Sequence, residues 1–308
     1  MPRKRDFYHT GLDISRSELA YMRQPNPSGA EDYVVDLNAA ATGSGNLNYP
    51  FSTIAEAIAA SNASIGLREN RWWARRNRIF VMGDGIEEDL TVLPEKCDII
   101  GVGSDLVPYP RVIGHHIIAL AKVGCRFINM GFIDDAVSDL FVIPAGCHGL
   151  TFIGGQMVPN VAGSTKALEI TSSALVTVRG VDIVKNAGNP VAGIFAQGIS
   201  LEGAAGSHQT DIDDNFIEAT EGITVANTCL AYSSKVRRNT IHATALTVND
   251  LSDLVHVISN DLISDASVAL AAAANGIVCN ELLASGNKIS GKDTVRNADY
   301  PFVIQLTS

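Results

Sequence analysis

The chain has 308 residues, of which 46% are hydrophobic and 18% are charged, and its formal net charge is −10. This composition supports a folded core and excludes a disordered chain, and the acidic charge excludes a general nucleic-acid binder. No apolar run approaches the roughly 18 residues of a membrane-spanning helix, so no membrane partner is expected.

Residues 1–32 form a polar, non-repeating segment that we interpret as an N-terminal arm. Arg3, Lys4 and Arg5 lead it, and two prolines between Gln24 and Gly29 interrupt regular structure. No apolar region follows the basic start, so no signal peptide is expected. The arm is either a disordered tail or a segment that docks on a partner through its basic residues.

A strand at 34–37 and a helix near 53–61 follow the arm. Ser52 or Thr53 caps the helix, and Glu56 completes a capping box. The helix presents one apolar face, formed by Ile54, Ala57, Ile58 and Ser61. We expect it to cover the open end of a solenoid, which would otherwise expose apolar surface and unpaired strand edges.

Five arginines surround both tryptophans of the chain between residues 68 and 78. Two interpretations stay open. The tryptophans pack under the capping helix with the arginine stems over them, or the stretch binds a partner, as aromatic platforms with arginine do. The candidate partner-binding residues are Arg71, Trp72, Trp73, Arg75 and Arg76.

From Leu90 onward one phrase recurs, best seen as Ile223–Val225 followed by Val236–Ile241. Its first strand begins at residues 90, 118, 141, 168, 199, 223, 246 and 268, at intervals of 22 to 31 residues. Repeats of this length are typical of solenoids. The apolar positions lie two apart in runs of three to five residues, which favours short strands over helices. A leucine-rich repeat needs a denser leucine phrase, which is absent.

The pattern predicts an all-β parallel β-helix over residues 33–290, with the capping helix at its start. An asparagine recurs after the second strand, at Asn215, Asn239 and Asn260. Asparagine tolerates the left-handed backbone of a sharp bend, and stacked asparagines hydrogen-bond to one another. We therefore expect a structural asparagine ladder at one corner.

Pro50–Ile54, Gly85–Leu90 and Ile99–Gly103 resemble the opening turns of the pectin-lyase-like superfamily, in particular the versions in bacteriophage tail spikes and related virion proteins. The resemblance covers about residues 34–105 by motif and extends to about 290 by repeat. It implies a right-handed, single-stranded parallel β-helix. The arginine and tryptophan stretch stands where the family has a short connection.

Aligning the repeats stacks charged residues on one outer face, with neighbouring strands about 4.8 Å apart. Asp211 is predicted to lie over Lys235, Asp213 over Arg237 and Asp214 over Arg238, with Arg179 on the other side of Asp213. This is either a salt-bridge ladder or a catalytic site for glycoside hydrolysis or for a Ca²⁺-dependent lyase. The catalytic candidates are Asp211, Asp213, Asp214, Arg237, Arg238 and His256. Ca²⁺ belongs only to the lyase alternative, and otherwise no cofactor is expected.

The cysteines and histidines show no metal-ligand spacing. The five cysteines lie in or beside apolar strands, which predicts buried free thiols. The histidines, including His115, His116, His148, His208 and His242, are expected in turns or on the surface. No metal site is predicted.

Residues 291–308 leave the repeat, and 300–306 form a predicted last strand. The features together favour a bacteriophage virion structural protein, a homotrimeric capsid decoration or a spike or fibre subunit whose arm docks on other virion proteins. Such a protein is located in the virion after synthesis in the host cytoplasm. The alternative is a tail-spike-like or bacterial polysaccharide lyase or glycoside hydrolase that acts on a surface polysaccharide.

Overall fold

The computed structural model describes residues 30–36, 38–39, 41–67, 75–83, 85–103, 109–250, 252, 254–264, 276–278 and 284–291. Most of the arm, including Arg3, Lys4 and Arg5, lies outside these ranges. So do the Arg71–Trp73 stretch and the strands predicted to begin at 268 and at 300.

Parallel strand pairing organises the described chain into three rows. Row 1 contains β1 (Asp32–Asp36), β2 (Asn77–Met82), β4 (Cys97–Gly101), the first half of β7 (Arg126–Asp134) and of β9 (Thr151–Pro159), β11 (Thr177–Arg179), β14 (Asp211–Asp213), β16 (Lys235–Arg237), β19 (His256–Ile258) and β22 (Ala284–Ser285). Row 2 contains β3 (Ile86–Glu87), β5 (Arg111–Ile113), the second halves of β7 and β9, β12 (Asp182–Ile183), the first half of β15 (Phe216–Val225), β17 (Thr240–Ala243), β20 (Asp261–Ser264) and β23 (Lys288–Gly291). Row 3 contains β6 (His116–Ile117), β8 (Phe141–Ile143), β10 (Lys166–Thr171), β13 (Phe195–Glu202), the second half of β15, β18 (Leu246–Asp250) and β21 (Gly276–Val278).

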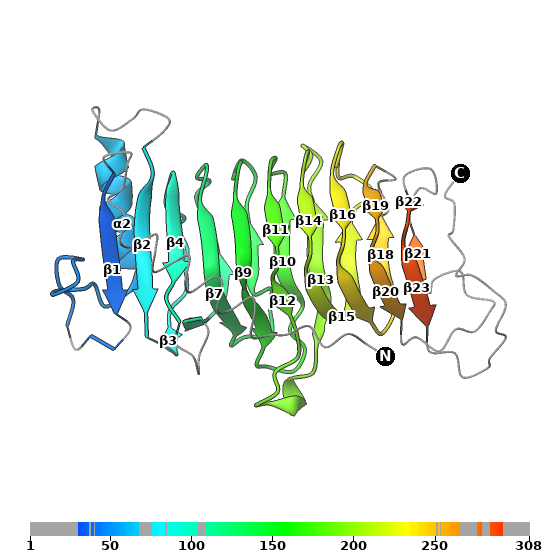
Figure 1. The fold of residues 1–308 in the computed structure, drawn as a ribbon, viewed down its shortest axis with the longest axis horizontal. Coiled ribbons are helices and arrows are strands. Elements are labelled where there is room, and N and C mark those ends of the chain that lie inside the picture. Colours follow the sequence, from blue (N-terminus) through cyan, green and yellow to red (C-terminus); the bar gives the residue numbers. More distant parts are fainter. Residues whose placement is uncertain are drawn as a thin grey trace.

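From β4 to β23 the chain passes through row 1, row 2 and row 3 in that order, again and again. The strands of each row stack along the long axis of the molecule (Figure 1). Within the described ranges every pairing between two named strands is parallel, and row 1 partners are 20 to 34 residues apart from Ile79 to Val257. The protein is therefore mostly β, with a long parallel sheet, and is consistent with an all-β parallel solenoid.

The predicted capping helix is α2 (Ile54–Gly66), which lies beside β1 and β2 at the N-terminal end of the stack (Figure 1). Thr53 and Glu56 form the capping box, and the predicted apolar face is buried. The Glu88 carboxylate adds a second anchor, since it accepts hydrogen bonds from the backbone N–H groups of Ile54 (2.9 Å) and Ala55 (2.6 Å).

No helix in the part of the chain that the structure describes is long and apolar enough to cross a membrane. The short 3₁₀ segment Pro190–Ala192 precedes β13.

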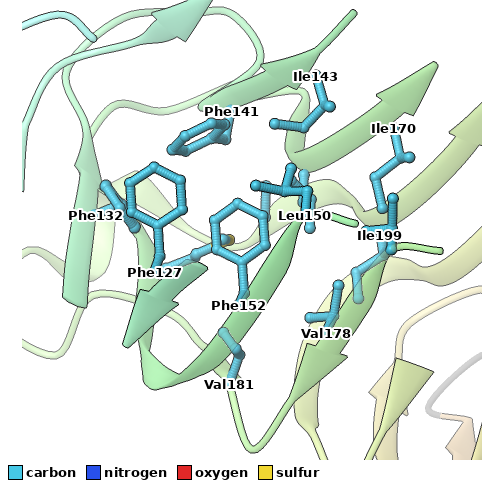
Figure 2. Packing of buried hydrophobic residues seen from close by; sticks show 14 of the residues in the cluster. Phe127, Phe132, Phe141, Ile143, Leu150, Phe152, Ile170, Val178, Val181 and Ile199 are labelled. Atoms are coloured by element: carbon cyan, nitrogen blue, oxygen red, sulfur yellow. The ribbon is translucent and has the colours of Figure 1, made fainter. Parts of the chain in front are cut away.

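The core is a set of apolar columns that run through the stacked strands. One column contains Ile79, Ile99, Phe127, Phe152, Val178, Ile212, Val236 and Val257, all fully or almost fully buried. Figure 2 shows the aromatic part of this core, where Phe127 stacks on Phe152 at a centroid distance of 5.1 Å and meets Phe132 and Phe141 edge-on. Because each strand is short, this shared column rather than any single strand supplies the buried area.

Two predicted registers are wrong by two residues. His116 and Ile118, rather than Ile118 and Leu120, align with β8, so His116 takes an interior position and Leu120 is exposed. Val248, rather than Leu246, pairs with Ile223. In both places alternation alone cannot distinguish registers that differ by two residues, because the same side of the strand still faces inward.

The predicted role of asparagine in the bend is also wrong. The left-handed residue is the one before each asparagine, namely Asp214, Arg238 and Ser259 with φ of 54°, 54° and 55°. Glycine takes the same position at Gly180 and Gly286. The backbone strain therefore falls on an exposed residue, and the asparagine keeps an ordinary backbone while its side chain points into the corner.

Four of the predicted free thiols lie within the described residues, and all four are buried: Cys97, Cys125, Cys147 and Cys229. Burial raises the pKa of Cys97 to about 12, so this thiol stays protonated. These side chains act as small apolar core residues.

Phe127→Ala tests the continuous core. The ring is buried and contacts three other phenylalanines, so its loss should lower the free energy of unfolding by about 3–5 kcal/mol. Urea denaturation followed by circular dichroism measures the change. Val191→Ala, at a side chain that is 81% exposed, is the control and should stay within about 0.5 kcal/mol. Equal midpoints for the two variants would contradict the packing described.

Candidate functional site

The outer face of row 1 carries two stretches of charges that alternate in sign, separated by Thr151 and Thr177. At its N-terminal end the register partners are Asp32, Arg78, Asp98 and Arg126. Arg78 forms a two-pronged ion pair with Asp32 and is almost fully buried. Asp98, 1% exposed, is held by Arg126, with Nε to Oδ1 at 2.7 Å, and also by Arg76. This N-terminal ladder was not predicted, because the sequence repeat is degenerate there.

The predicted charged cluster forms a second ladder towards the C-terminal end of the same face. The backbone register is as expected, with Asp211 opposite Lys235, Asp213 opposite Arg237, and Arg179 on the other side of Asp213. The side chains pair diagonally, however. Arg237 donates to both oxygens of Asp211, with Nε to Oδ1 at 3.0 Å, and Arg238 donates to both oxygens of Asp213, with Nε to Oδ1 at 2.8 Å.

Asp213 is the centre of this ladder and is only 2% exposed. Besides Arg238, the guanidinium of Arg237 lies 3.7 Å and that of Arg179 lies 3.8 Å from its Oδ2. Because three guanidinium groups surround this carboxylate and Arg238 uses both of its oxygens, no oxygen is left free to exchange a proton with a substrate. Because arginine N–H groups take both oxygens, the pair Asp211 and Asp213 is also a poor cradle for Ca²⁺.

The remaining catalytic candidates do not complete a site. Asp214 is the exposed left-handed bend residue, and it has interactions of its own. His256 lies opposite Lys235 at the next level of the stack. The geometry therefore brings together Arg179, Asp211, Asp213, Arg237 and Arg238 as an ion-pair ladder.

Arg75 and Arg76, predicted as partner-binding residues, make contacts inside the molecule. Arg75 is buried and donates to Ser64 Oγ of α2 at 3.3 Å. Arg76 reaches Asp98 and the backbone oxygen of Gly124 at 2.6 Å. Both guanidinium groups thus tie the stretch before β2 to the end of the stack, which leaves them little freedom to bind a partner.

The three predicted asparagines form one continuous chain of hydrogen bonds. Asn215 Nδ2 donates to Asn239 Oδ1 at 2.9 Å, and Asn239 Nδ2 donates to Asn260 Oδ1 at 3.0 Å. The Oδ1 atoms of Asn239 and Asn260 also accept from the backbone N–H of the preceding ladder asparagine. Each Nδ2 also donates to a strand carbonyl, Val178 for Asn215 and Ile212 for Asn239. Every donor and acceptor of these buried amides is therefore used.

A fourth asparagine, Asn287, extends the ladder and was missed. Its Oδ1 accepts from Asn260 Nδ2 at 2.9 Å, and its own Nδ2 donates to Val257 O at 2.8 Å. The sequence signal was present, since Gly286-Asn287 precedes β23 as Ser259-Asn260 precedes β20. At the other end, Asn215 Oδ1 accepts from Val181 N, where the ladder stops at a valine.

His116, the first residue of β6, is fully buried and packs against Phe132 and Phe141. Its predicted surface position is therefore wrong. Its Nδ1 accepts from Leu90 N at 3.1 Å, which places the ring hydrogen on Nε2, and Nε2 has no hydrogen-bond partner. Burial lowers the pKa of His116 to about 3. The ring is therefore a neutral core residue at physiological pH.

The expectation that His115 has no ligand-like neighbours is wrong as well. Its Nδ1 lies 3.5 Å from Asp89 Oδ1 and 3.6 Å from Asp135 Oδ1. The sequence does not reveal this cluster because the three residues are 26 and 20 positions apart and belong to three levels of the stack.

Comparison with known proteins adds no assignment. No protein-family model matches the chain, and no curated protein is significantly similar to it.

Asn239→Ala tests the asparagine ladder. The change removes the partners that the Asn239 side chain gives to the Asn215 backbone N–H and the Ile212 carbonyl, and it removes one of the two hydrogen bonds of Asn260 Oδ1. The free energy of unfolding should therefore fall by about 3 kcal/mol or more. Urea denaturation measures the loss. Asn48→Ala, at an exposed position, should stay within about 0.5 kcal/mol. A loss no greater than that of the control would show that the ladder contributes nothing.

His116→Gln tests the buried imidazole through pH. Burial lowers the pKa of His116 to about 3 in the folded state, against 6.5 for an unperturbed histidine, so the fold favours the neutral ring. Its contribution to stability is complete above pH 6.5 and is lost as pH falls towards 3, which amounts to about 2 kcal/mol between pH 6.5 and 5.

The His116→Gln variant keeps an acceptor for Leu90 N but cannot be protonated. Its free energy of unfolding should therefore fall less steeply than that of the wild type over this range. Urea titrations at pH 7, 6 and 5 measure both slopes. Equal slopes would contradict the depressed pKa.

Proposed function

We propose that the chain is a structural subunit of a bacteriophage particle, a right-handed single-stranded parallel β-helix that assembles as a homotrimeric decoration, spike or fibre protein. Its N-terminal arm docks on other proteins of the particle. The fold assignment to the pectin-lyase-like superfamily is part of the proposal. It is supported by the opening motifs of the sequence and by three rows of parallel strands visited in a repeating order.

The observation that carries the proposal is the ion-pair ladder on the outer face of row 1. Carbohydrate-active enzymes of this architecture need carboxylates that are free to exchange protons or to bind a cation. Here Asp211 and Asp213, the carboxylates of the ladder near the C-terminal end of that face, are each held by both prongs of an arginine. A face whose charges neutralise one another stabilises the stack, which is what a rod-like structural subunit requires.

An exposed apolar edge supports assembly. Val123, Leu175 and Tyr232 are 42%, 56% and 52% exposed, and each lies two or three residues before a row 1 strand. Because row 1 strands are in register, these side chains lie near one edge of the stack, at alternate levels, and His148 and His208 occupy the levels between them. Exposed apolar side chains gathered at one edge favour a surface that further copies of the chain bury.

Oligomeric state tests the assembly. Light scattering coupled to size exclusion should give three times the chain mass of 32.6 kDa. The double change Leu175→Asp and Tyr232→Asp should dissociate the assembly, while Val191→Asp, at another exposed apolar position, should not. A wild-type monomer over a wide concentration range would contradict the trimer.

The competing outcome is that the protein cleaves polysaccharides. Incubation with a panel of bacterial capsular polysaccharides, followed by measurement of polymer length, tests for this activity. We expect no loss of polymer length on incubation with the protein. Depolymerisation that disappears in Asp213→Ala but persists in Asp139→Asn, a carboxylate outside the ladder, would replace the structural proposal by the lyase or hydrolase alternative.

A further inference from the structure

Three potential metal ligands from three consecutive levels of the stack meet at one corner. Asp89 follows β3, His115 follows β5, and Asp135 follows β7. One ligand atom from each lies within 4.8 Å of the others. This cluster is separate from the ion-pair ladders of row 1 and plays no part in the proposed structural function.

The strand register places the three residues at equivalent positions. Glu87 pairs with Ile113, and Ile113 pairs with Ile133. Each ligand lies two residues beyond one of these partners, so the three side chains leave the stack at the same corner. The fold therefore aligns them over one another without any special loop.

The backbone holds the first carboxylate in place. The N–H of His115 donates to Asp89 Oδ1 at 2.9 Å. Gly114 makes this approach possible, because a Cβ there would lie 2.5 Å from the same oxygen. The carboxylate is thus positioned directly against the histidine.

Nδ1 of His115 is a buried polar atom that lacks a hydrogen-bond partner. The distances of 3.5 and 3.6 Å to the two aspartate oxygens are too long for good hydrogen bonds. A second buried atom at this corner, Oδ2 of Asp134, also has no hydrogen-bond partner. Buried polar atoms of folded proteins nearly always have partners, so the unsatisfied nitrogen indicates a ligand that bridges it to the carboxylates.

The spacing suits a metal ion. Tetrahedral Zn²⁺ with ligands at about 2.0–2.2 Å places neighbouring ligand atoms about 3.4 Å apart, close to the two distances at His115. One imidazole with two carboxylates is a donor set for zinc-class ions, whereas Ca²⁺ prefers six or more oxygens. Two carboxylates and a neutral imidazole also balance the charge of a divalent ion.

We propose that Asp89, His115 and Asp135 bind a divalent transition-metal ion of the zinc class, with water in the remaining position. The three side chains are 48%, 39% and 43% exposed, so an ion can reach them from solvent. The ion joins three levels of the stack next to the capping helix, because Glu88, adjacent to Asp89, holds the first turn of α2. It thereby fastens the N-terminal end of the solenoid.

Calorimetric titration of metal-stripped full-length protein tests the proposal. Zn²⁺ should bind at one site per chain with micromolar affinity or better and raise the midpoint of thermal unfolding. Co²⁺ should give the intense visible absorption of a four-coordinate site, and Ca²⁺ and Mg²⁺ should bind much more weakly.

Matched variants locate the site. His115→Ala should abolish the stoichiometric binding, and Asp135→Asn should weaken it at least tenfold while keeping the shape of the side chain. His148→Ala, at another exposed histidine, should bind Zn²⁺ as the wild type does.

Two results would overturn the proposal. One is wild-type protein that binds no Zn²⁺. The other is Zn²⁺ binding that is unchanged in both His115→Ala and Asp135→Asn.

Discussion

In-register parallel stacking is the constraint on which the rest of this structure depends. When strands of successive levels pair in register about 4.8 Å apart, each side chain lies between its counterparts above and below. A position is therefore stable only if its residue tolerates a column of similar neighbours. Apolar residues meet this condition in the interior, asparagines meet it by donating and accepting along the column, and charged residues meet it by alternating in sign.

Each of these solutions occupies its own place. The column from Ile79 to Val257 is apolar throughout, and its aromatic section is the stacked pair Phe127 and Phe152. The asparagine ladder occupies the corner after row 1, where strand carbonyls would otherwise lack donors. The bend itself is left to the residue before each asparagine. At this corner an exposed residue adopts the left-handed backbone, and the buried asparagine after it donates hydrogen bonds to the strand carbonyls.

The sequence alone predicts the features that repeat. The capping box, the short strands, the asparagine column and the backbone register of Asp211 and Asp213 all follow from periodicity and residue type. Prediction from the sequence fails where two strand registers turn the same side of the strand towards the core. His116 and Val248 show this, since a shift of two residues leaves the alternation intact and only packing decides between the registers. The hydrogen-bond partners of long side chains are mispredicted for a related reason. An arginine reaches diagonally past its register partner, as Arg237 does when it donates to Asp211.

The corner at His115 departs from the rule that row 1 follows. On row 1 a stacked carboxylate is held by both prongs of an arginine from the neighbouring level, as Arg126 holds Asp98 and Arg238 holds Asp213. At the other corner the residue between Asp89 and Asp135 is a histidine, and its nitrogen stays outside hydrogen-bond distance of both. An arginine there would neutralise the two carboxylates at any pH, whereas a histidine carries no permanent charge. A divalent cation among the three side chains would supply that positive charge, and the distances at His115 are close to those between neighbouring ligand atoms of tetrahedral zinc.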